Sequence, residues 1–245
     1  MCRNHVVILA VTVSSLFSMA VCAQETKQES AVIKADSSET TATLFKFNLS
    51  SSNKEEWNVP SRAELDESGL HIENDQSLLL LNKPVGNVMA EKGVEASVAI
   101  SGFEKKGDSK EKLRTHARIF LTPLKLEGFI DPYVMSDMIC LVVEYVEGVD
   151  VSLQLYGKSA PGDGWGKCLW TGTVPADQFP FTVSLRINST DYKVRCDKTL
   201  TTTGGSLSGQ HQFQKDKWAS DVRFGVKSCY GTRPGNVIIR SVEIR

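Results

Sequence analysis

Short segments that alternate hydrophobic and polar residues follow one another through most of the chain. The clearest is Val149–Tyr156, in which every odd-numbered position is apolar. Phe181–Ile187 repeats the arrangement, and 218–226 and 236–245 close the chain in the same style. Successive side chains of a strand point to opposite faces, so each segment predicts a strand with one buried face.

Turn-forming residues separate these segments, for example Glu147-Gly148, Gly204-Gly205 and Pro234-Gly235. Roughly twelve to fourteen strands are predicted, with no amphipathic helix longer than three turns. The charged stretch 103–113 is expected to be a solvated loop. Many short strands over one region predict an all-β fold, a two-sheet antiparallel β-sandwich of the jelly-roll type.

The N-terminal region divides into two segments. Residues 1–23 resemble a secretory signal peptide: Arg3 and His5 precede an apolar run, and Val21-Cys-Ala23 offers small residues before a cleavage site. The run is short for a spanning helix of about 20 residues, which disfavours a retained membrane anchor. Residues 24–42 are polar and predict a disordered linker, and 43–245 predict one β-sandwich domain. We therefore expect a secreted or periplasmic protein.

The composition excludes some classes of binding partner. The chain has 245 residues, 41% of them hydrophobic, and a formal net charge of −1. So small a charge lacks the long-range attraction that nucleic acid binding uses. No stretch after the signal peptide is long and apolar enough for membrane insertion. Four cysteines follow the signal peptide: Cys140, Cys168, Cys196 and Cys229. In an oxidising compartment they predict two disulfides, with buried thiols as the alternative.

The order of features then resembles the concanavalin A-like lectin/glucanase superfamily, including its laminin-G-like jelly rolls. An opening strand with Trp57 leads to Asp66-Glu-Ser-Gly-Leu70, and a central meander is followed by 179–194 and a terminal strand at 237–244. The resemblance implies the fold and, by analogy, a carbohydrate partner. It also makes one structural calcium plausible, near Asp131, Asp137, Asp150 or Asp163, without assigning a site.

A polar sheet face is the first candidate binding site. Alternation places His116 and Arg118 on one side of 114–120, and Gln154 and Tyr156 on one side of the strand after the next. Thr182, Ser184 and Arg186 follow the same rule further on. Adjacent strands of this kind would offer amides, a phenol and cations to sugar hydroxyls or uronic carboxylates. The alternative is an ordinary solvated outer face.

The loop 157–166 is the second candidate site. It carries Asp163 and Trp165 among glycines, so Trp165 is expected to stack on a sugar ring and Asp163 to bind hydroxyls. A Trp folded back over the sheet edge is the alternative. Galectins show a similar order of His, Arg, Trp-Gly and Phe-Pro-Phe, here His116, Arg118, Trp165-Gly166 and 179–181, but their Asn-Pro strand motif is missing.

Sequence patterns for catalysis are weaker than those for binding. The Glu-x-Asp-x-x-Glu strand of family 16-type glycosidases is absent. Arg62-Ala-Glu-Leu65, Gln210-His211 and Tyr230 are loosely similar to alginate-lyase-like enzymes. We therefore predict a secreted, non-catalytic, lectin-like protein with no assigned catalytic residue, and an extracellular poly- or oligosaccharide as its partner. A polysaccharide-degrading enzyme, glycosidase or lyase, and a protein-binding adhesion module are the alternatives.

Overall fold

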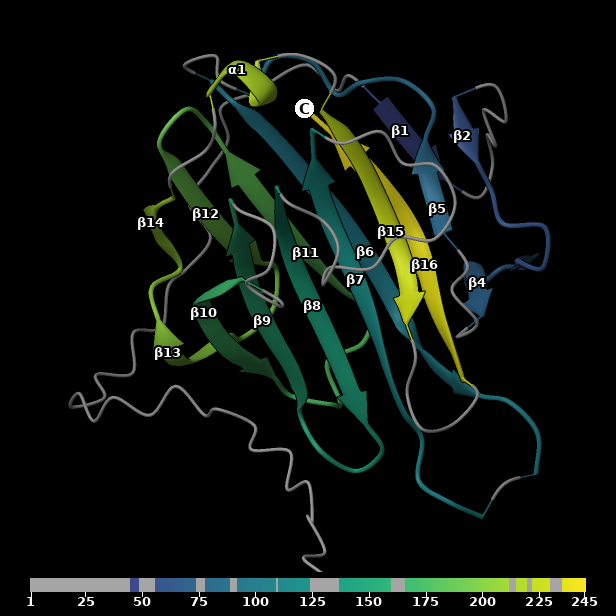
Figure 1. Cartoon of the computed structure of the whole chain (residues 1–245). Helices are drawn as coiled ribbons and strands as arrows, with labels where there is room; N and C mark the ends of the chain where they lie inside the picture. The colour runs from purple at the N-terminus through teal and green to yellow at the C-terminus, as the bar shows by residue number, and fades with distance from the viewer. Residues whose placement is uncertain are drawn as a thin grey trace, which may run out of the picture.

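The computed structural model describes residues 45–48, 56–73, 78–88, 92–108, 110–123, 137–159, 166–211, 215–219, 222–229 and 235–245. These residues form two antiparallel sheets stacked face to face, with one helical turn, α1 (Lys215–Trp218), at one end (Figure 1). The predicted all-β sandwich is confirmed. No described helix is long and apolar enough to cross a membrane.

The first layer, sheet A, follows the order β14-β12-β11-β6-β16-β4-β3, and β1 pairs with β16. Its strands are β1 (Phe45–Asn48), β3 (Glu64–Leu65), β4 (Leu70–Glu73), β6 (Val94–Lys105), β11 (Phe181–Ile187), β12 (Asp191–Cys196), β14 (Ser208–Gln210) and β16 (Gly235–Ile244).

The second layer, sheet B, follows the order β13-β10-β9-β8-β7-β15-β5-β2. Its strands are β2 (Trp57–Asn58), β5 (Leu78–Leu81), β7 (Arg114–Thr122), β8 (Met138–Val146), β9 (Val151–Lys158), β10 (Lys167–Val174), β13 (Thr201–Gly205) and β15 (Arg223–Cys229). The consecutive strands β7 to β10 form a continuous meander, which fixes the relative positions of their outward side chains.

The hydrophobic core lies between the two sheets. Strand β11 contributes Phe181, Val183, Leu185 and Ile187, which is the inward set that its alternation predicted. From sheet B, β9 contributes Val151, Leu153 and Leu155, and Trp170 of β10 is fully buried among them. Because both inner faces are apolar, each strand leaves its alternate residues on an outer face.

Two strand predictions were wrong in detail. Val149 was expected to be inward but is 53% exposed, because the turn at Gly148, with φ +80°, ends before it and β9 begins only at Val151. The segment 218–226 was expected to be one strand, whereas Trp218 closes α1 and is buried, and β15 starts at Arg223. The charged loop is also shorter than expected, since β6 continues to Lys105.

The structure does not show the predicted disulfides. Cys140, Cys168 and Cys196 are thiols in this structure, so the two expected disulfides are not formed among the four cysteines. Cys140 of β8 and Cys168 of β10 are each in register with Tyr156 of β9, which places a strand between them. A disulfide needs Cα atoms within about 7 Å, whereas two strand spacings are about 9.5 Å.

Candidate functional site

The outer face of sheet B brings four of the six predicted site residues together. His116 and Arg118 of β7 and Gln154 and Tyr156 of β9 project from the same face of the sheet, and β8 lies between the two strands. Val142 of β8 is in register with both Arg118 and Gln154. We call these five residues the β7–β9 patch. Twice the strand spacing places Arg118 and Gln154 roughly 9.5 Å apart across it.

His116 and Arg118 form one unit of the patch. Nη2 of Arg118 lies 3.4 Å from Nε2 of His116. Burial, together with the positive charges of Arg118 and Arg114, lowers the pKa of His116 to about 4. The imidazole is therefore neutral at pH 7, and because a guanidinium can only donate, Nε2 is the acceptor and the ring proton lies on Nδ1.

Gln154 and Tyr156 form the other unit. The Tyr156 hydroxyl donates to Oε1 of Gln154 at 2.6 Å, and Nε2 of Gln154 donates to Oγ of Ser152 at 3.3 Å. This chain along β9 holds the amide and the phenol in fixed orientations. The phenolic oxygen keeps lone pairs that can accept a hydrogen bond from a ligand hydroxyl.

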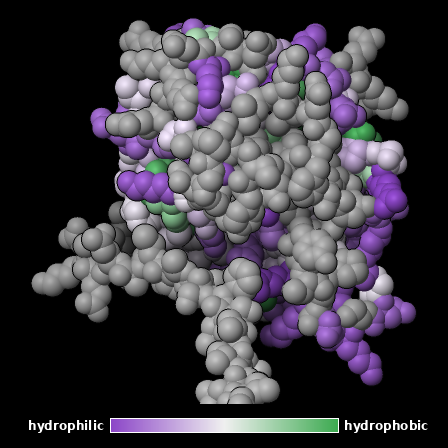
Figure 2. Space-filling model, in the orientation of Figure 1, coloured by the Kyte–Doolittle hydropathy of each residue, from purple (hydrophilic) through white to green (hydrophobic). Residues whose placement is uncertain are grey.

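The patch lies at the edge of a more enclosed region. Further along the same face, Phe120, Cys140 and Lys158 are at most 3% exposed, whereas Gln154 and Tyr156 are partly open. Val142, 6% exposed, is an apolar floor between the two polar units. An apolar floor flanked by oriented polar groups is the general make-up of a small-ligand site. Hydrophilic side chains dominate among the described residues visible in Figure 2.

A single carboxylate is found on the outward strand positions described for this face. Glu144 of β8 binds Arg114 of β7, with Oε1 at 2.9 Å from Nε and 2.8 Å from Nη2. Arg114 therefore has an acidic partner on the neighbouring strand. Arg118 is instead in register with Val142 on one side and with Lys227 of β15 on the other.

Other predicted residues lie elsewhere. Thr182, Ser184 and Arg186 belong to β11 and hence to sheet A, so they cannot join the β7–β9 patch. Alternation gave their direction correctly but could not show which sheet they occupy. Asp163 and Trp165 lie outside the described residues. The galectin-like order is not a spatial cluster either, because Phe181 lies in the core from sheet A.

The acidic residues considered for calcium have other roles where they are described. Oδ2 of the buried Asp137 lies 3.0 Å from Nζ of Lys217, and Oδ1 of Asp150 accepts from the Ala176 amide at 3.3 Å. Asp131 and Asp163 lie outside the described residues. In the described part of the chain, no three His, Cys, Asp or Glu side chains gather as a metal site. Calcium remains a prediction from the resemblance.

The lyase-like pattern is dispersed. Glu64 lies on β3 and Gln210 on β14, the two opposite ends of the strand order of sheet A. Six strand spacings amount to about 29 Å along the sheet. His211 follows β14, and Tyr230 is outside the described residues. Arg62 and Glu64 therefore cannot act on the same bond as Gln210 and His211.

Sheet A carries a second histidine cluster that sequence reasoning did not find. Nδ1 of His71 lies 2.9 Å from Oε2 of Glu104, and Nε2 lies 3.0 Å from Oγ of Ser68 and 3.1 Å from Oδ1 of Asp66. Oγ of Ser68 also donates to that Asp66 oxygen at 2.6 Å. The arrangement has the order of a Ser-His-Glu triad, but the Ser68 hydroxyl is committed to Asp66. It ties the β3–β4 turn to β6.

Burial opposes the charged form of His71, but hydrogen bonds and charge from Glu104 and Asp66 outweigh it and raise its pKa. Hydrogen bonds from Ser68 and His71 hold the pKa of Asp66 well below its usual range. This histidine and its carboxylates therefore form a clamp that favours the charged form of the imidazole. The sequence signal that could have found it is the short spacing of Asp66, Ser68 and His71 around a tight turn.

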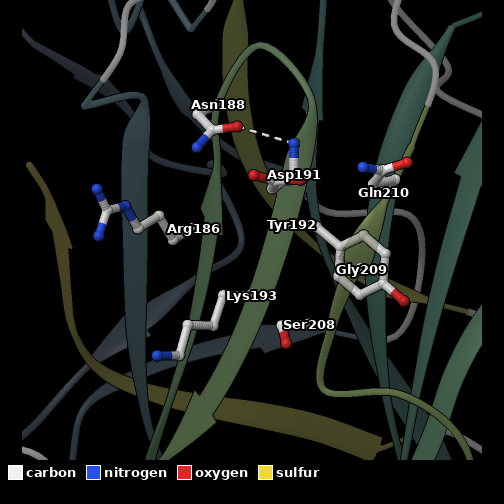
Figure 3. A pocket seen from close by; sticks show the side chains of 8 residues that line it. All are labelled: Arg186, Asn188, Asp191, Tyr192, Lys193, Ser208, Gly209 and Gln210. Atoms are coloured by element: carbon white, nitrogen blue, oxygen red, sulfur yellow. Dashed lines mark hydrogen bonds between the residues drawn. The ribbon is translucent and has the colours of Figure 1, made fainter.

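A hollow of about 410 Å³ also lies at the β14 edge of sheet A (Figure 3). Its polar groups serve the β11–β12 hairpin: Arg186 donates to the Lys92 carbonyl at 3.1 Å, and Oδ1 of Asn188 accepts from the Asp191 amide at 2.8 Å. In Figure 3 the side chains of Arg186 and Lys193 extend to one side of the hairpin and the Tyr192 ring to the other. We assign this hollow a structural role.

Comparison with solved structures shows the fold. The legume lectin-like domain from Entamoeba histolytica matches with a TM-score of 0.58 and 8% identity, over 84% of this chain and 99% of that chain. The chain has a concanavalin A-like jelly-roll fold. The metal-free Emp46p carbohydrate recognition domain matches this fold with a TM-score of 0.54 and 11% identity, over 79% and 89%.

An enzyme shares the concanavalin A-like fold too. The Crh5 transglycosylase in complex with NAG matches with a TM-score of 0.51 and 12% identity, over 83% of this chain and 84% of that chain. No protein-family model and no curated protein matches the sequence. At these identities the likeness establishes the fold, and the function must be argued from the residues themselves.

Proposed function

We propose that this protein is a secreted or periplasmic, non-catalytic carbohydrate-binding protein, and that the β7–β9 patch is its binding surface. One observation carries the proposal: the meander β7–β9 sets the His116–Arg118 unit and the Gln154–Tyr156 unit on either side of Val142. Two oriented polar groups across an apolar floor suit a sugar ring, which offers hydroxyls at its edges and C–H groups on its faces.

A binding role accounts for the described side chains of the patch more simply than catalysis does. Canonical glycosidases use two carboxyl groups that flank the scissile bond. Glu144 is the carboxylate described beside the patch, and Arg114 neutralises it. A neutral His116 that accepts from Arg118 acts as a positioning group for the guanidinium rather than as a proton donor to it.

The proposal is tested by affinity electrophoresis of the purified protein in gels cast with separate neutral and acidic polysaccharides. We expect retardation by at least one polymer, without release of reducing ends or unsaturated products during incubation. Gln154→Ala should abolish the retardation, whereas Ser97→Ala on the outer face of sheet A should not. Trp165→Ala tests the remaining predicted stacking residue in the same gels.

Other outcomes have definite meanings. Product release that depends on patch residues would replace the binding function with a polysaccharide-degrading one. Normal mobility in every gel, with copurification of a protein partner, would favour the adhesion module. Retardation that Gln154→Ala leaves unchanged would place the binding surface elsewhere on the molecule.

A further inference from the structure

The row of outward side chains in the β7–β9 patch continues beyond β9. Gln154 of β9 is in register with Thr171 of β10, and Thr171 is in register with Gly204 of β13. With Arg118 and Val142 this makes one row of register partners across five strands of sheet B. Four strand spacings amount to about 19 Å. The row is therefore longer than a single sugar residue.

A β-bulge in β13 shapes the far end of this row. Thr171 pairs with Gly204, but the next residue of β10, Gly172, pairs with Thr202, so Thr203 is the extra residue of the bulge. Oγ1 of Thr203 donates to Oγ1 of Thr171 at 3.1 Å. Bulges are common at sheet edges and beside functional sites, where they redirect a side chain. Here the bulge directs the Thr203 hydroxyl onto the outer face.

The Thr171–Thr203 pair can both donate and accept hydrogen bonds. Thr203 gives its proton to Thr171, so the Thr203 oxygen can accept, while the Thr171 hydroxyl keeps a proton to donate. Thr171 is partly exposed and Thr203 is exposed. A donor and an acceptor side by side match two neighbouring hydroxyls of a sugar. Beside the pair, Nε2 of Gln154 directs one of its two hydrogens at Oγ of Ser152, so the amide can donate a second hydrogen bond.

Gly204 ends the row in backbone rather than in a side chain. A Cβ at this position would lie 2.9 Å from Oγ1 of Thr171, and the φ of Gly204 is outside the left-handed region. The space beside the Thr171 hydroxyl, not the backbone conformation, therefore explains the glycine. Strand β13 is the end strand of sheet B (Figure 1). Glycine in a strand is typical of a bulge or of a place where a ligand approaches closely.

We propose that the ligand is a stretch of several consecutive sugars that runs across the strands of sheet B. One sugar contacts the β7–β9 patch, and a further sugar of the same chain binds the Thr171–Thr203 pair beside Gly204. This inference rests on the proposed carbohydrate-binding function and adds a second subsite, the length of the ligand and its direction across the strands.

A series of oligosaccharides of increasing length provides the test. The gels of the preceding experiment are cast with xylan, laminarin, galactomannan, polygalacturonate and chondroitin sulfate, and the polymer that retards the protein is partly hydrolysed and separated by length. By isothermal titration calorimetry we expect the affinity to rise at least tenfold from the disaccharide to longer oligosaccharides. It should then stay constant once the row is filled.

Variants locate the second subsite. Thr171→Val and Thr203→Val each keep the shape of the side chain and remove one hydroxyl. Each should weaken binding of the longer oligosaccharides about fivefold, as expected for one lost hydrogen bond, and leave binding of the disaccharide unchanged. Thr182→Val makes the same change on the outer face of sheet A and should alter the affinity less than twofold at every length. The melting temperature of each variant confirms that it is folded.

The outcomes separate the two proposals. An affinity that is already complete with the disaccharide, and that is lost in Gln154→Ala, would overturn the extended ligand and leave the carbohydrate function standing. A gain with length that neither Thr171→Val nor Thr203→Val reduces would overturn the second subsite. Equal losses at every length would mean that the threonine pair only supports the fold. No binding of any polymer would overturn the carbohydrate function and this inference together.

Discussion

The outer faces of the two sheets differ in how their polar side chains are paired. On sheet A, polar groups pair with one another: Arg195 lies 3.8 Å from Glu95, and the Ser97 and Ser184 hydroxyls are 2.8 Å apart. On sheet B, Arg118 is in register with Lys227, and its Nη2 lies beside Nε2 of the neutral His116. The pairs on sheet A thus join an acid to a base or two hydroxyls, whereas on sheet B two basic residues are register partners and a neutral imidazole lies beside one of them.

The two histidines show the same contrast in one side chain. His71 on sheet A lies between Asp66 and Glu104, which favour its charged form and raise its pKa. For His116 on sheet B, burial and the charges of Arg118 and Arg114 favour the neutral form and lower its pKa. The environment, not the residue type, therefore decides that the charged form is favoured at His71 and the neutral form at His116.

The largest expected effect on stability comes from substituting residues of β8, where neighbouring residues lie on opposite faces of the sheet. Leu141 is fully buried between the sheets, so Leu141→Ala should lower the free energy of unfolding by about 2–5 kcal/mol. Val142 is on the outer face and 6% exposed, so Val142→Ala should cost about 1–2 kcal/mol for the two carbons removed, while weakening ligand binding. Urea denaturation measures both. A greater loss of stability in Val142→Ala would show that the outer face is part of the core.

The second effect is the pH dependence caused by His116. Its pKa is about 4 when folded and near 6.5 when unfolded, so the unfolded chain binds more protons between these values. Stability should therefore fall as the pH drops through that window, by about 2 kcal/mol from this residue at pH 5. His116→Gln should remove this part of the slope, measured by urea denaturation at pH 5 and pH 8.

His71 should give the opposite slope. Its folded pKa is raised above the unfolded value, so its stabilising contribution is complete below pH 6.5 and is lost as the pH rises through the folded pKa. His71→Gln should therefore destabilise the protein more at pH 5 than at pH 8. If both variants changed stability equally at the two pH values, the contrast between the faces would not extend to their histidines.

A smaller effect concerns the hydrogen-bonded chain on β9. Tyr156→Phe removes the hydroxyl that donates to Gln154 and should weaken ligand binding by about 1 kcal/mol, roughly fivefold. The melting temperature should change little, because both side chains are partly open. Titration calorimetry with the bound polysaccharide measures the loss, and unchanged affinity would remove Tyr156 from the site.

The smallest effect is expected on sheet A. Arg195→Gln breaks a partly exposed ion pair with Glu95, and such pairs contribute about 0–1 kcal/mol. Ligand affinity should stay the same within twofold. Chemical denaturation and calorimetry on one preparation check both statements, and a large loss of affinity would mean that sheet A, not sheet B, faces the ligand.

The sequence was enough to predict each strand that has a strict alternation. Phe181–Ile187 became β11 with the expected inward residues, because period two alone determines which side chains a strand can bury. Predictions were wrong where turns or a helix changed the local geometry, as at Val149 and Trp218. The predicted disulfides are not shown by the structure, and the spacing of cysteines along the chain carries no information on the distance between strands.

The candidate binding site, like the fold, was predicted from the sequence only in part. By itself, the sequence determined the class of fold, the inward and outward residues of its regular strands, and the four polar residues that became the patch. Tertiary structure decided that β7 and β9 lie on either side of β8 in one sheet while β11 lies in the other. It also placed Lys227 beside Arg118, more than a hundred positions away in the chain. Side-chain direction is a local property of a strand, whereas strand order, burial and charge arise only when distant segments pair and pack.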